Sequence, residues 1–380
     1  MRFKKKNLLF EERIKSEMPV PNEVKQIHSL FKKNGFKLFI VGGAVRDTLL
    51  GKPIKDYDLA TDAPPETVDN MLRDAGIKTI GTGAAFGVIN AYINNEEYEI
   101  ATFREDVGKG RRPDSVIFSD IETDVKRRDL TINALFYDIA SKEIVDLVGG
   151  MEDIKNGVVR TVGDANERFG EDRLRILRAI RFAGRTGSKL DPAIDKALRN
   201  DNSLEGISGE RIMDEFLKGI NSAKSTKYFL TLLDKYSLFD WIFKGMSPIN
   251  KQFVDENNEI LAIAVLLKGV QYDTIGKKLN ALKYSSNKIK EIVFLVAFNQ
   301  VFSEDTFYVL KKMHGKSGVS SNTFLAFAEA MGIDIQRTRD FINFSLSITG
   351  DFVKEKYGLK DGPELGVKIK ELETNKFFLR

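Results

Sequence analysis

Two segments of the chain decide its fold: LFIVGGAVRD at residues 38–47 and KDYDLATD at residues 55–62. The first is an apolar strand that runs into Gly42 and Gly43. Two adjacent glycines after a strand let backbone N–H groups approach a phosphate closely, because no Cβ stands in the way. Taken alone, such a pair is more often a plain tight turn, so the second segment has to support the first.

The second segment contains two carboxylates, Asp56 and Asp58, close to a further apolar strand. Side chains alternate along an extended segment, so these two point to the same side. Mg²⁺ prefers one or two carboxylates and keeps its other positions for water and substrate phosphates. An Asp-x-Asp pair alone is commonly a solvated loop, but after the glycine turn it favours metal-assisted transfer of a nucleotide.

Composition narrows the chemistry further. The chain has 380 residues, which allows about two or three domains, and it contains no cysteine and only two histidines, His28 and His314. Disulfides, thiolate zinc sites and the histidine-rich metal sites of phosphohydrolases are therefore excluded. The net charge of +4 argues only weakly for a polyanionic partner. No apolar run of about 18 residues occurs and the N-terminus lacks a cleavable signal, so we expect a cytoplasmic protein with no membrane partner.

Hydrophobic periodicity predicts strands in the first 160 residues and helices almost without exception after residue 165. This order indicates an α/β head, in which helices flank a mixed β-sheet, followed by an all-α remainder. The helices expected in the first half are 20–36, 44–50, 64–76, 124–134 and 171–182, and the expected strands are 38–41, the segment holding Asp56 and Asp58, 87–93, 98–103, 116–118, 136–139, 144–147 and 158–161.

The segment 104–115 is charged, contains glycine and has no apolar period, so it is expected to be a mobile loop. Most such loops are inert connections. Because this one directly follows the expected hairpin strand 98–103, we interpret it as a loop that closes on substrate.

The segment 171–182 is predicted to be an amphipathic helix, with many arginines for a surface helix stabilised by salt bridges. Asp172 and Arg175 lie one helical turn apart, so a hydrogen-bond acceptor and a donor fork can face the same ligand. Cytosine and adenine present an amino donor beside a ring-nitrogen acceptor, whereas uracil and guanine present the reverse order. The pair can therefore accept C and A without a template, because a rejected base leaves polar groups unpaired at a cost of about 1–3 kcal/mol each.

As an ordered set, the motifs of this chain resemble those of the class II tRNA nucleotidyltransferases, the CCA-adding enzymes, and of their relatives the bacterial poly(A) polymerases. The likeness covers nearly the whole chain. Residues 42–47 and 56–61 look like the family's catalytic motif, and KRRDLTINA at 126–134 looks like its ribose-contact motif. EDRLR at 171–175, together with Arg178, looks like its base-selecting motif. ISGERI at 207–212 with Glu215 looks like its neck motif, and GPELG at 362–366 looks like its tail signature.

The resemblance implies roles for individual residues. Asp56 and Asp58 would bind two Mg²⁺ ions, and Glu99 would be the third carboxylate, which helps to deprotonate the primer hydroxyl; Glu96 and Glu97 stand close by. The implied nucleotide-binding residues are Gly42, Gly43 and Arg46 for the triphosphate, Arg128, Asp129 and Asn133 for the sugar, and Asp172 and Arg175 for the base, supported by Arg178. Tyr57 departs from the family, which more often has an aliphatic residue there, and is expected to point away from the metals.

The resemblance also implies an elongated, seahorse-like division of the chain. Its parts would be a catalytic head (1–148), a neck with the base-selecting helix (149–222), a helical body (223–304) and a helical, tRNA-binding tail (305–380). The implied reaction adds C, C and A to the 3′ end of tRNA from CTP and ATP, releases pyrophosphate and needs no template strand. The implied partner is the tRNA acceptor arm, contacted mostly through phosphates and shape.

Three alternatives stay open. A bacterial poly(A) polymerase lies in the same class, although the arginine-rich segment associated with that branch has no obvious match here. A partial enzyme could add only CC or only A; the segment 104–115, which resembles the element linked to the switch from C to A, argues against CC-only but not against A-only. In a different class, the chain would be a non-catalytic RNA-binding protein in which Asp56 and Asp58 are merely solvated.

Overall fold

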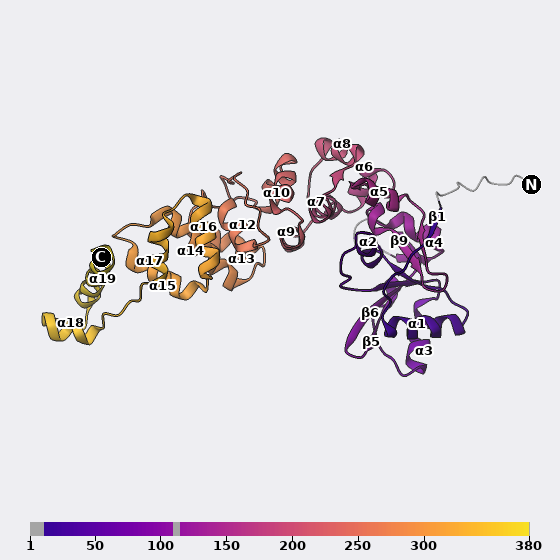
Figure 1. Cartoon of the computed structure of the whole chain (residues 1–380), viewed down its shortest axis with the longest axis horizontal. Helices are drawn as coiled ribbons and strands as arrows, with labels where there is room; N and C mark the ends of the chain where they lie inside the picture. The colour runs from indigo at the N-terminus through magenta and orange to yellow at the C-terminus, as the bar shows by residue number, and fades with distance from the viewer. Residues whose placement is uncertain (1–10, 109–114, 380) are drawn as a thin grey trace, which may run out of the picture. The chain divides into compact units, whose positions relative to one another are not determined.

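The computed structural model describes residues 11–108 and 115–379 (Figure 1). The chain forms two compact units, one ending at Gly206 and the other beginning at Ile207. The first contains a mixed sheet with helices and the second is all-helical, which confirms the expected fold class. The four-part division of the chain stays a prediction. Within the described ranges, no helix combines the length and the apolar character that crossing a membrane requires.

The first unit is built on an eight-stranded sheet with the order β1-β10-β9-β2-β3-β6-β5-β4. Its strands are β1 (Glu12–Lys15), β2 (Leu38–Val41), β3 (Asp58–Thr61), β4 (Lys78–Gly83), β5 (Val88–Ile93), β6 (Glu96–Thr102), β9 (Leu135–Asp138) and β10 (Glu143–Asp146). Within this sheet β3 and β6 pair in parallel, whereas the other neighbours pair antiparallel. The strand that begins with Asp58 therefore lies in the middle of the sheet, flanked by β2 and β6.

The apolar run of β2 is buried on both faces of the sheet. Leu38 and Ile40 pack into a core with the helices α1 (Asn22–Lys33) and α3 (Pro65–Asp74), which lie side by side in Figure 1. The residue between them, Phe39, packs into a second core on the opposite face. A strand covered on both faces has no polar side, and this explains the uninterrupted apolar sequence.

The predicted hairpin is confirmed as β5 and β6, which are joined at Asn94 and Asn95. These two residues have φ angles of 52° and 67°. Asparagine is enriched in this left-handed region, and two such residues in a row make the turn that matches the twist of a hairpin.

The expected loop at 104–115 is ordered at both of its ends. Arg104–Val107 forms β7 and pairs antiparallel with β8 (Ser115–Phe118), so the segment is a second hairpin and not a plain loop. The middle of the expected loop, residues 109–114, lies outside the described residues. Phe118 packs close to Gly87, because a Cβ added to that glycine would lie 3.0 Å from the ring.

The expected helix at 124–134 is wrong. The chain forms two short 3-10 turns, separated by Arg128 in an extended conformation. Leu130 makes an antiparallel bridge with Thr161, which uses backbone groups that a helix would need for its own ladder. A contact between segments distant in sequence thus overrides the local pattern.

The remaining elements of the first unit are short. They are α2 (Gly43–Leu49), α4 (Ile121–Asp124), the 3-10 turns Ala84–Phe86, Val125–Arg127 and Thr131–Asn133, α5 (Gly150–Asn156), β11 (Val158–Val159), α6 (Ala165–Glu171), α7 (Leu174–Thr186), β12 (Lys189–Leu190) and α8 (Pro192–Asn200). The strand expected at 158–161 is therefore two residues long and pairs with β12. The two-residue strand β12 carries too little periodicity to be predicted, and β1 (ERIK) has no apolar run that would mark a strand.

The second unit consists of helices around aromatic cores. They are α9 (Gly209–Ser222), α10 (Thr226–Lys235), α11 (Phe239–Ile242), α12 (Glu259–Leu266), α13 (Tyr272–Ala281), α14 (Ser286–Val301), α15 (Phe307–Ser317), α16 (Ser321–Met331), α17 (Ile335–Asn343), α18 (Gly350–Tyr357) and α19 (Pro363–Phe378). Phe298 packs its ring 4.8 Å from Phe324 and 5.0 Å from Phe341, which joins α14 to α16 and α17. Aromatic burial of this kind is a large stabilising contribution in a helical body.

Candidate active site

Three carboxylates gather at one end of the central strands. Asp58 is the first residue of β3, and Asp56 lies two residues before it, outside the strand. The parallel pairing places Leu59 beside Ile100, so Asp58 and Glu99, which precede them, are neighbours on adjacent strands. All three carboxylates are exposed. Sheet pairing thus brings together the aspartate pair and the third carboxylate predicted from the sequence.

The negative charges of these carboxylates affect one another's pKa values. Asp58 is exposed, but the surrounding protein removes enough water to raise its pKa. The charge of Asp56 raises this pKa further, and the charge of Arg128 lowers it in part. Partial loss of water likewise raises the pKa of Glu99; Asp58 adds to that shift and Arg104 opposes it. Loss of water and the neighbouring carboxylates together thus disfavour the ionised forms more than the nearby arginines favour them.

This charge fits a divalent cation. Raised carboxylate pKa values mean that the ionised forms are costly without a positive partner, and a bound cation would remove that cost. Within the described residues, no three carboxylate or imidazole side chains converge into a complete metal site. The aspartates would therefore supply only part of a coordination shell, as suits Mg²⁺, which keeps positions for water and phosphate.

The structure separates Glu99 from its neighbour Glu97. One carboxylate oxygen of Glu97 accepts hydrogen bonds from Asn90 at 2.6 Å and from the hydroxyl of Tyr92 at 3.0 Å. Glu97 is thereby occupied on the hairpin, whereas Glu99 adjoins Asp58. Among the carboxylates of this strand, Glu99 is the one placed to act with the aspartates.

The glycine turn has the conformation that the sequence suggested. Gly42 has a φ of 68°, and the following helix α2 begins at Gly43. The N–H of Gly42 donates a hydrogen bond of 3.0 Å to the carbonyl of Leu135 in β9. This N–H can reach a phosphate only if that bond breaks, so a phosphate at the turn would use the amides that follow.

Arg46 and Asn133, predicted to contact the triphosphate and the sugar, meet each other in the structure. Arg46 is only 3% exposed; its guanidinium donates to the side-chain oxygen of Asn133 at 2.5 Å and to Asp47 at 3.0 Å. Arg185 of α7 also contacts Asp47, at 2.7 Å. The ring of Phe182 lies 4.8 Å from the Arg46 guanidinium. The contacts of Arg46 with the triphosphate and of Asn133 with the sugar stay predictions. In the structure, this cluster joins α2 to α7.

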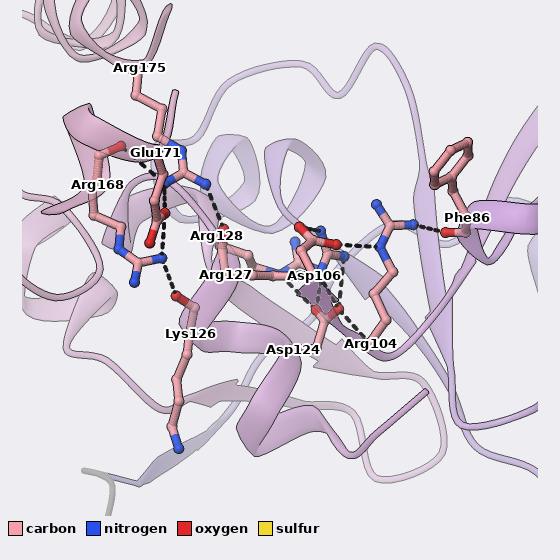
Figure 2. Close-up of polar contacts among 10 residues, drawn as sticks. All are labelled: Phe86, Arg104, Asp106, Asp124, Lys126, Arg127, Arg128, Arg168, Glu171 and Arg175. Atoms are coloured by element: carbon pink, nitrogen blue, oxygen red, sulfur yellow. Dashed lines mark hydrogen bonds and ion pairs between the residues drawn. The ribbon is translucent and has the colours of Figure 1, made fainter. Parts of the chain in front are cut away.

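The sugar-contact segment is held by buried ion pairs (Figure 2). Asp124 is 1% exposed and binds Arg127 at 2.8 Å and Arg128 at 3.0 Å. Burial alone would raise the pKa of Asp124, but the charges of Arg128 and Arg127 outweigh it and hold the pKa below its usual value. The Arg128 guanidinium also lies 4.8 Å from the ring of Phe136. Sequence reasoning missed Asp124 and Arg127, because their meaning depends on these contacts.

The next residue, Asp129, contacts Arg178 of α7. Its carboxylate accepts a hydrogen bond of 2.6 Å from Arg178 and another of 2.8 Å from the N–H of Leu130. Burial works against ionisation, but Arg178 keeps the pKa of Asp129 below its usual value. The structure therefore brings Arg178 to the sugar-contact segment.

The predicted helix at 171–182 begins later than expected. Helix α6 ends at Glu171, and α7 starts at Leu174. Asp172 lies in the break between them, where its carboxylate accepts a hydrogen bond of 3.0 Å from the N–H of Leu174. The expectation that Asp172 and Arg175 share one helix is thus wrong. They remain close, since the N–H of Arg175 donates to the carbonyl of Asp172 at 3.0 Å.

Arg175 is held from three sides, as Figure 2 shows. Its guanidinium donates to the carbonyl oxygens of Arg168, at 3.2 Å, and Arg127, at 3.1 Å, and pairs with Glu171 at 2.5 Å. Arg168 in turn donates to the carbonyl of Lys126 at 2.9 Å. These five residues line one pocket. Arg168 was not anticipated, because a single arginine in a short helix gives no signal in the sequence.

Two family models match the chain. Residues 38–160 match the poly A polymerase head domain, and residues 189–249 match the probable RNA and SrmB-binding site of polymerase A. The CCA-adding enzyme of Ligilactobacillus salivarius strain UCC118 is 32% identical over 390 residues, which cover 94% of this chain and 93% of that relative. The chain belongs to the CCA-adding enzyme family.

Other members of the CCA-adding family agree with this assignment. The CCA-adding enzyme of Streptococcus suis strain 05ZYH33 is 31% identical over 93% of this chain and 92% of its own length. Among solved structures, the Bacillus stearothermophilus CCA-adding enzyme in complex with CTP has a TM-score of 0.70 at 27% identity, over 92% of this chain and 91% of that one. The chain thus shares both sequence and fold with the family, whose members are nucleotidyltransferases that generally use divalent metals.

Proposed function

We propose that this chain adds C, C and A in turn to the 3′ end of tRNA, with CTP and ATP as donors, two Mg²⁺ ions as cofactors and pyrophosphate as the product. One observation carries the proposal: the paired strands β3 and β6 set Asp58 beside Glu99 in the same unit that holds Asp172 and Arg175. Relatives that carry the name CCA-adding enzyme match almost the whole chain, and the structure similar to it at 27% identity holds CTP. We also infer that the reaction takes place in the cytoplasm.

In this reaction the oxygen of the tRNA 3′-hydroxyl forms a bond to the α-phosphorus of the nucleotide, and the bond from that phosphorus to pyrophosphate breaks. Asp56 and Asp58 hold the cations. Cations held by Asp56 and Asp58 would lower the pKa of the attacking hydroxyl and would offset the charge of the leaving pyrophosphate. Glu99 receives the proton of the hydroxyl. Its place beside Asp58 on the paired strand suits this role, because a base must lie within reach of the proton that it removes.

In this proposal, separate groups of residues hold the triphosphate and the sugar of the nucleotide. Gly42, Gly43 and Arg46 support the triphosphate, and Arg128, Asp129 and Asn133 meet the sugar. The amide nitrogen of Asn133 is buried and has no hydrogen-bond partner among the described residues, so a ligand oxygen could satisfy it.

Base selection belongs to Asp172 and Arg175, with Arg178 in support. An acceptor on Asp172 and a donor fork on Arg175 match the pairing edges of cytosine and adenine and oppose those of uracil and guanine. The backbone carbonyls that hold Arg175 fix its fork before a base arrives. A fixed fork discriminates better than a mobile one, because a wrong base cannot be accommodated by movement.

The deciding experiment supplies purified protein and Mg²⁺ with a tRNA that lacks its terminal CCA, together with CTP and ATP, and sizes the product at nucleotide resolution. Growth by three nucleotides supports the proposal. Growth by two, addition of A only to a CC-ended tRNA, or a long A tract would identify a partial enzyme or a poly(A) polymerase. RNA binding without incorporation would identify a non-catalytic protein. The Asp58→Ala variant is the control and is expected to add nothing.

A further inference from the structure

Tyr57 links the turn that carries the two aspartates to a distant part of the chain. Its ring is half-buried against the core beneath the sheet, and its hydroxyl donates a hydrogen bond of 2.8 Å to the carbonyl oxygen of Pro19. Asp56 and Asp58 are exposed, whereas the ring of Tyr57 packs against the core, so the ring and the two carboxylates have different surroundings. Tyr57 can therefore act on the carboxylates only through the backbone between them.

The turn is anchored elsewhere by Ile54, which packs against the same core, but its backbone has few fixed contacts. Helix α2 ends at Leu49 and β3 begins at Asp58. Within the described chain, residues 53–56 make no backbone–backbone hydrogen bond, and Pro53 has no N–H to donate. A segment without a hydrogen-bonded ladder keeps its conformation through its side chains, and here Tyr57 provides a fixed attachment next to both carboxylates.

The acceptor of this hydrogen bond is itself fixed. Pro19 lies between β1 and α1, in a segment that is tied to the sheet at its start. The N–H of Ser16 donates to the carbonyl of Lys142 at 3.1 Å, and the hydroxyl of Tyr137 donates to the carbonyl of Ser16 at 3.2 Å. Met18 is 7% exposed and packs into the core of the same face. Pro19 is therefore a rigid point to which Tyr57 can be attached.

Packing alone does not fix the ring of Tyr57. A cavity of about 670 Å³ lies beside it, with Pro19 and Tyr137 among its other lining residues. A ring that borders open space can change its rotamer unless a directed contact holds it.

We propose that Tyr57 is a positioning residue for the metal-binding carboxylates: by tying the turn to Pro19, it fixes the separation and orientation of Asp56 and Asp58 before a cation binds. The inference rests on the proposed function, because it takes these two aspartates as the metal ligands. A turn held in its binding conformation does not lose conformational freedom when the cation arrives, and this raises the affinity for the cation.

The test compares Tyr57→Phe with Tyr137→Phe. Each variant loses one hydroxyl beside the same cavity and one hydrogen bond to the same segment, but only Tyr57 lies between the carboxylates. Binding of Mn²⁺, used as the probe, is measured by electron paramagnetic resonance of the free ion. Hydrogen–deuterium exchange of residues 51–58 is measured in the metal-free protein. Tyr57→Phe is expected to weaken Mn²⁺ binding about threefold to tenfold and to speed exchange in the turn, and Tyr137→Phe to leave both unchanged.

Nucleotide addition provides a second measure. The activity lost in Tyr57→Phe is expected to return at saturating Mg²⁺, because the variant lowers metal affinity and leaves the reacting groups in place. Equal Mn²⁺ affinity in Tyr57→Phe and the unaltered protein, or an equal loss in Tyr137→Phe, would overturn the inference. Asp58→Ala tests the proposed metal site independently of Tyr57. If this variant binds Mn²⁺ as the unaltered protein does, the proposed metal site itself is wrong.

Discussion

The guanidinium of Arg178 lies 2.6 Å from the carboxylate of Asp129, and this hydrogen-bonded ion pair joins α7 to the segment 126–134. The carboxylate is 11% exposed and the arginine side chain 33%. A charge pair shielded in this way is worth more than one on the surface, because less water competes for it. The sites proposed for the sugar and for the base are therefore mechanically connected.

Arg178→Ala is expected to destabilise the protein by about 2–4 kcal/mol, because it leaves the Asp129 carboxylate without its charged partner. Asp129→Asn should restore part of that loss in the double variant, since an amide carries no charge to compensate. Urea unfolding followed by circular dichroism of the two single variants and the double variant gives the coupling between them. Strictly additive effects would show that the two side chains do not depend on each other.

Asp172→Ala is expected to reduce the preference for CTP over UTP by about 10- to 100-fold, because the acceptor for the base amino group is lost. Single-turnover incorporation with each of the four nucleotides measures the preference. Arg173→Ala is the matched control: the residue is adjacent, but its guanidinium contacts Asp201, the residue that follows α8, at 2.5 Å. If Arg173→Ala relaxes the preference as much, the base-reading assignment is wrong.

Glu99→Gln is expected to lower kcat by about 10²- to 10⁴-fold, the range for removal of a general base. Glu97→Gln should stay within about threefold of the unaltered enzyme, because Glu97 is bound to Asn90 and Tyr92 and does not adjoin Asp58. Rapid-quench measurement of one CTP addition separates the chemical step from product release. A large loss in Glu97→Gln with little effect of Glu99→Gln would reverse the assignment.

His314 makes the second unit sensitive to acid. Loss of water and the nearby Lys311 charge lower the pKa of His314 from 6.5 to about 4, and its ring lies 5.2 Å from that of Phe294. The unfolded chain binds a proton more readily than the folded one, so stability falls as the pH drops from about 6.5 to about 4, by up to about 3 kcal/mol.

His314→Gln is expected to flatten this dependence. The single tryptophan of the chain, Trp241, lies in α11 of the second unit, so its fluorescence during urea unfolding reports on this unit. The free energy of unfolding is compared between pH 7 and pH 4.5 for both proteins. Parallel pH profiles would show that another group causes the acid sensitivity. His28→Gln, a change in the first unit, is expected to leave the tryptophan signal unaltered.

The parts of the site that sequence predicts are those whose geometry is local. The glycine turn at Gly42, the aspartate pair and the hairpin that carries Glu99 each follow from a few consecutive residues and their turn chemistry. Contacts between distant segments could not be predicted. Arg46 and Asn133 are 87 positions apart, and their hydrogen bond depends on how α2 packs beside β9.

The break before α7 illustrates the same limit in a different way. The apolar pattern of 171–182 is helical, but the carboxylate of Asp172 captures the N–H of Leu174 and starts a new helix there. An aspartate side chain can bond to a nearby backbone N–H and so interrupt a helix. The spacing of apolar residues gives no sign of such a bond. The sequence pattern therefore misplaced the helix boundary at Asp172, while the assignment of Asp172 and Arg175 to base selection stays a prediction.

The attachment of Arg175 to two carbonyl oxygens has an evolutionary consequence. Every residue type at positions 127 and 168 offers the same backbone oxygen, so those positions can drift without removing either acceptor. The guanidinium fork, by contrast, has no equivalent among the other side chains. We therefore expect the support of the fork to tolerate neutral change for as long as the paths of the two segments persist, while a change at Arg175 alters which nucleotides the protein can choose.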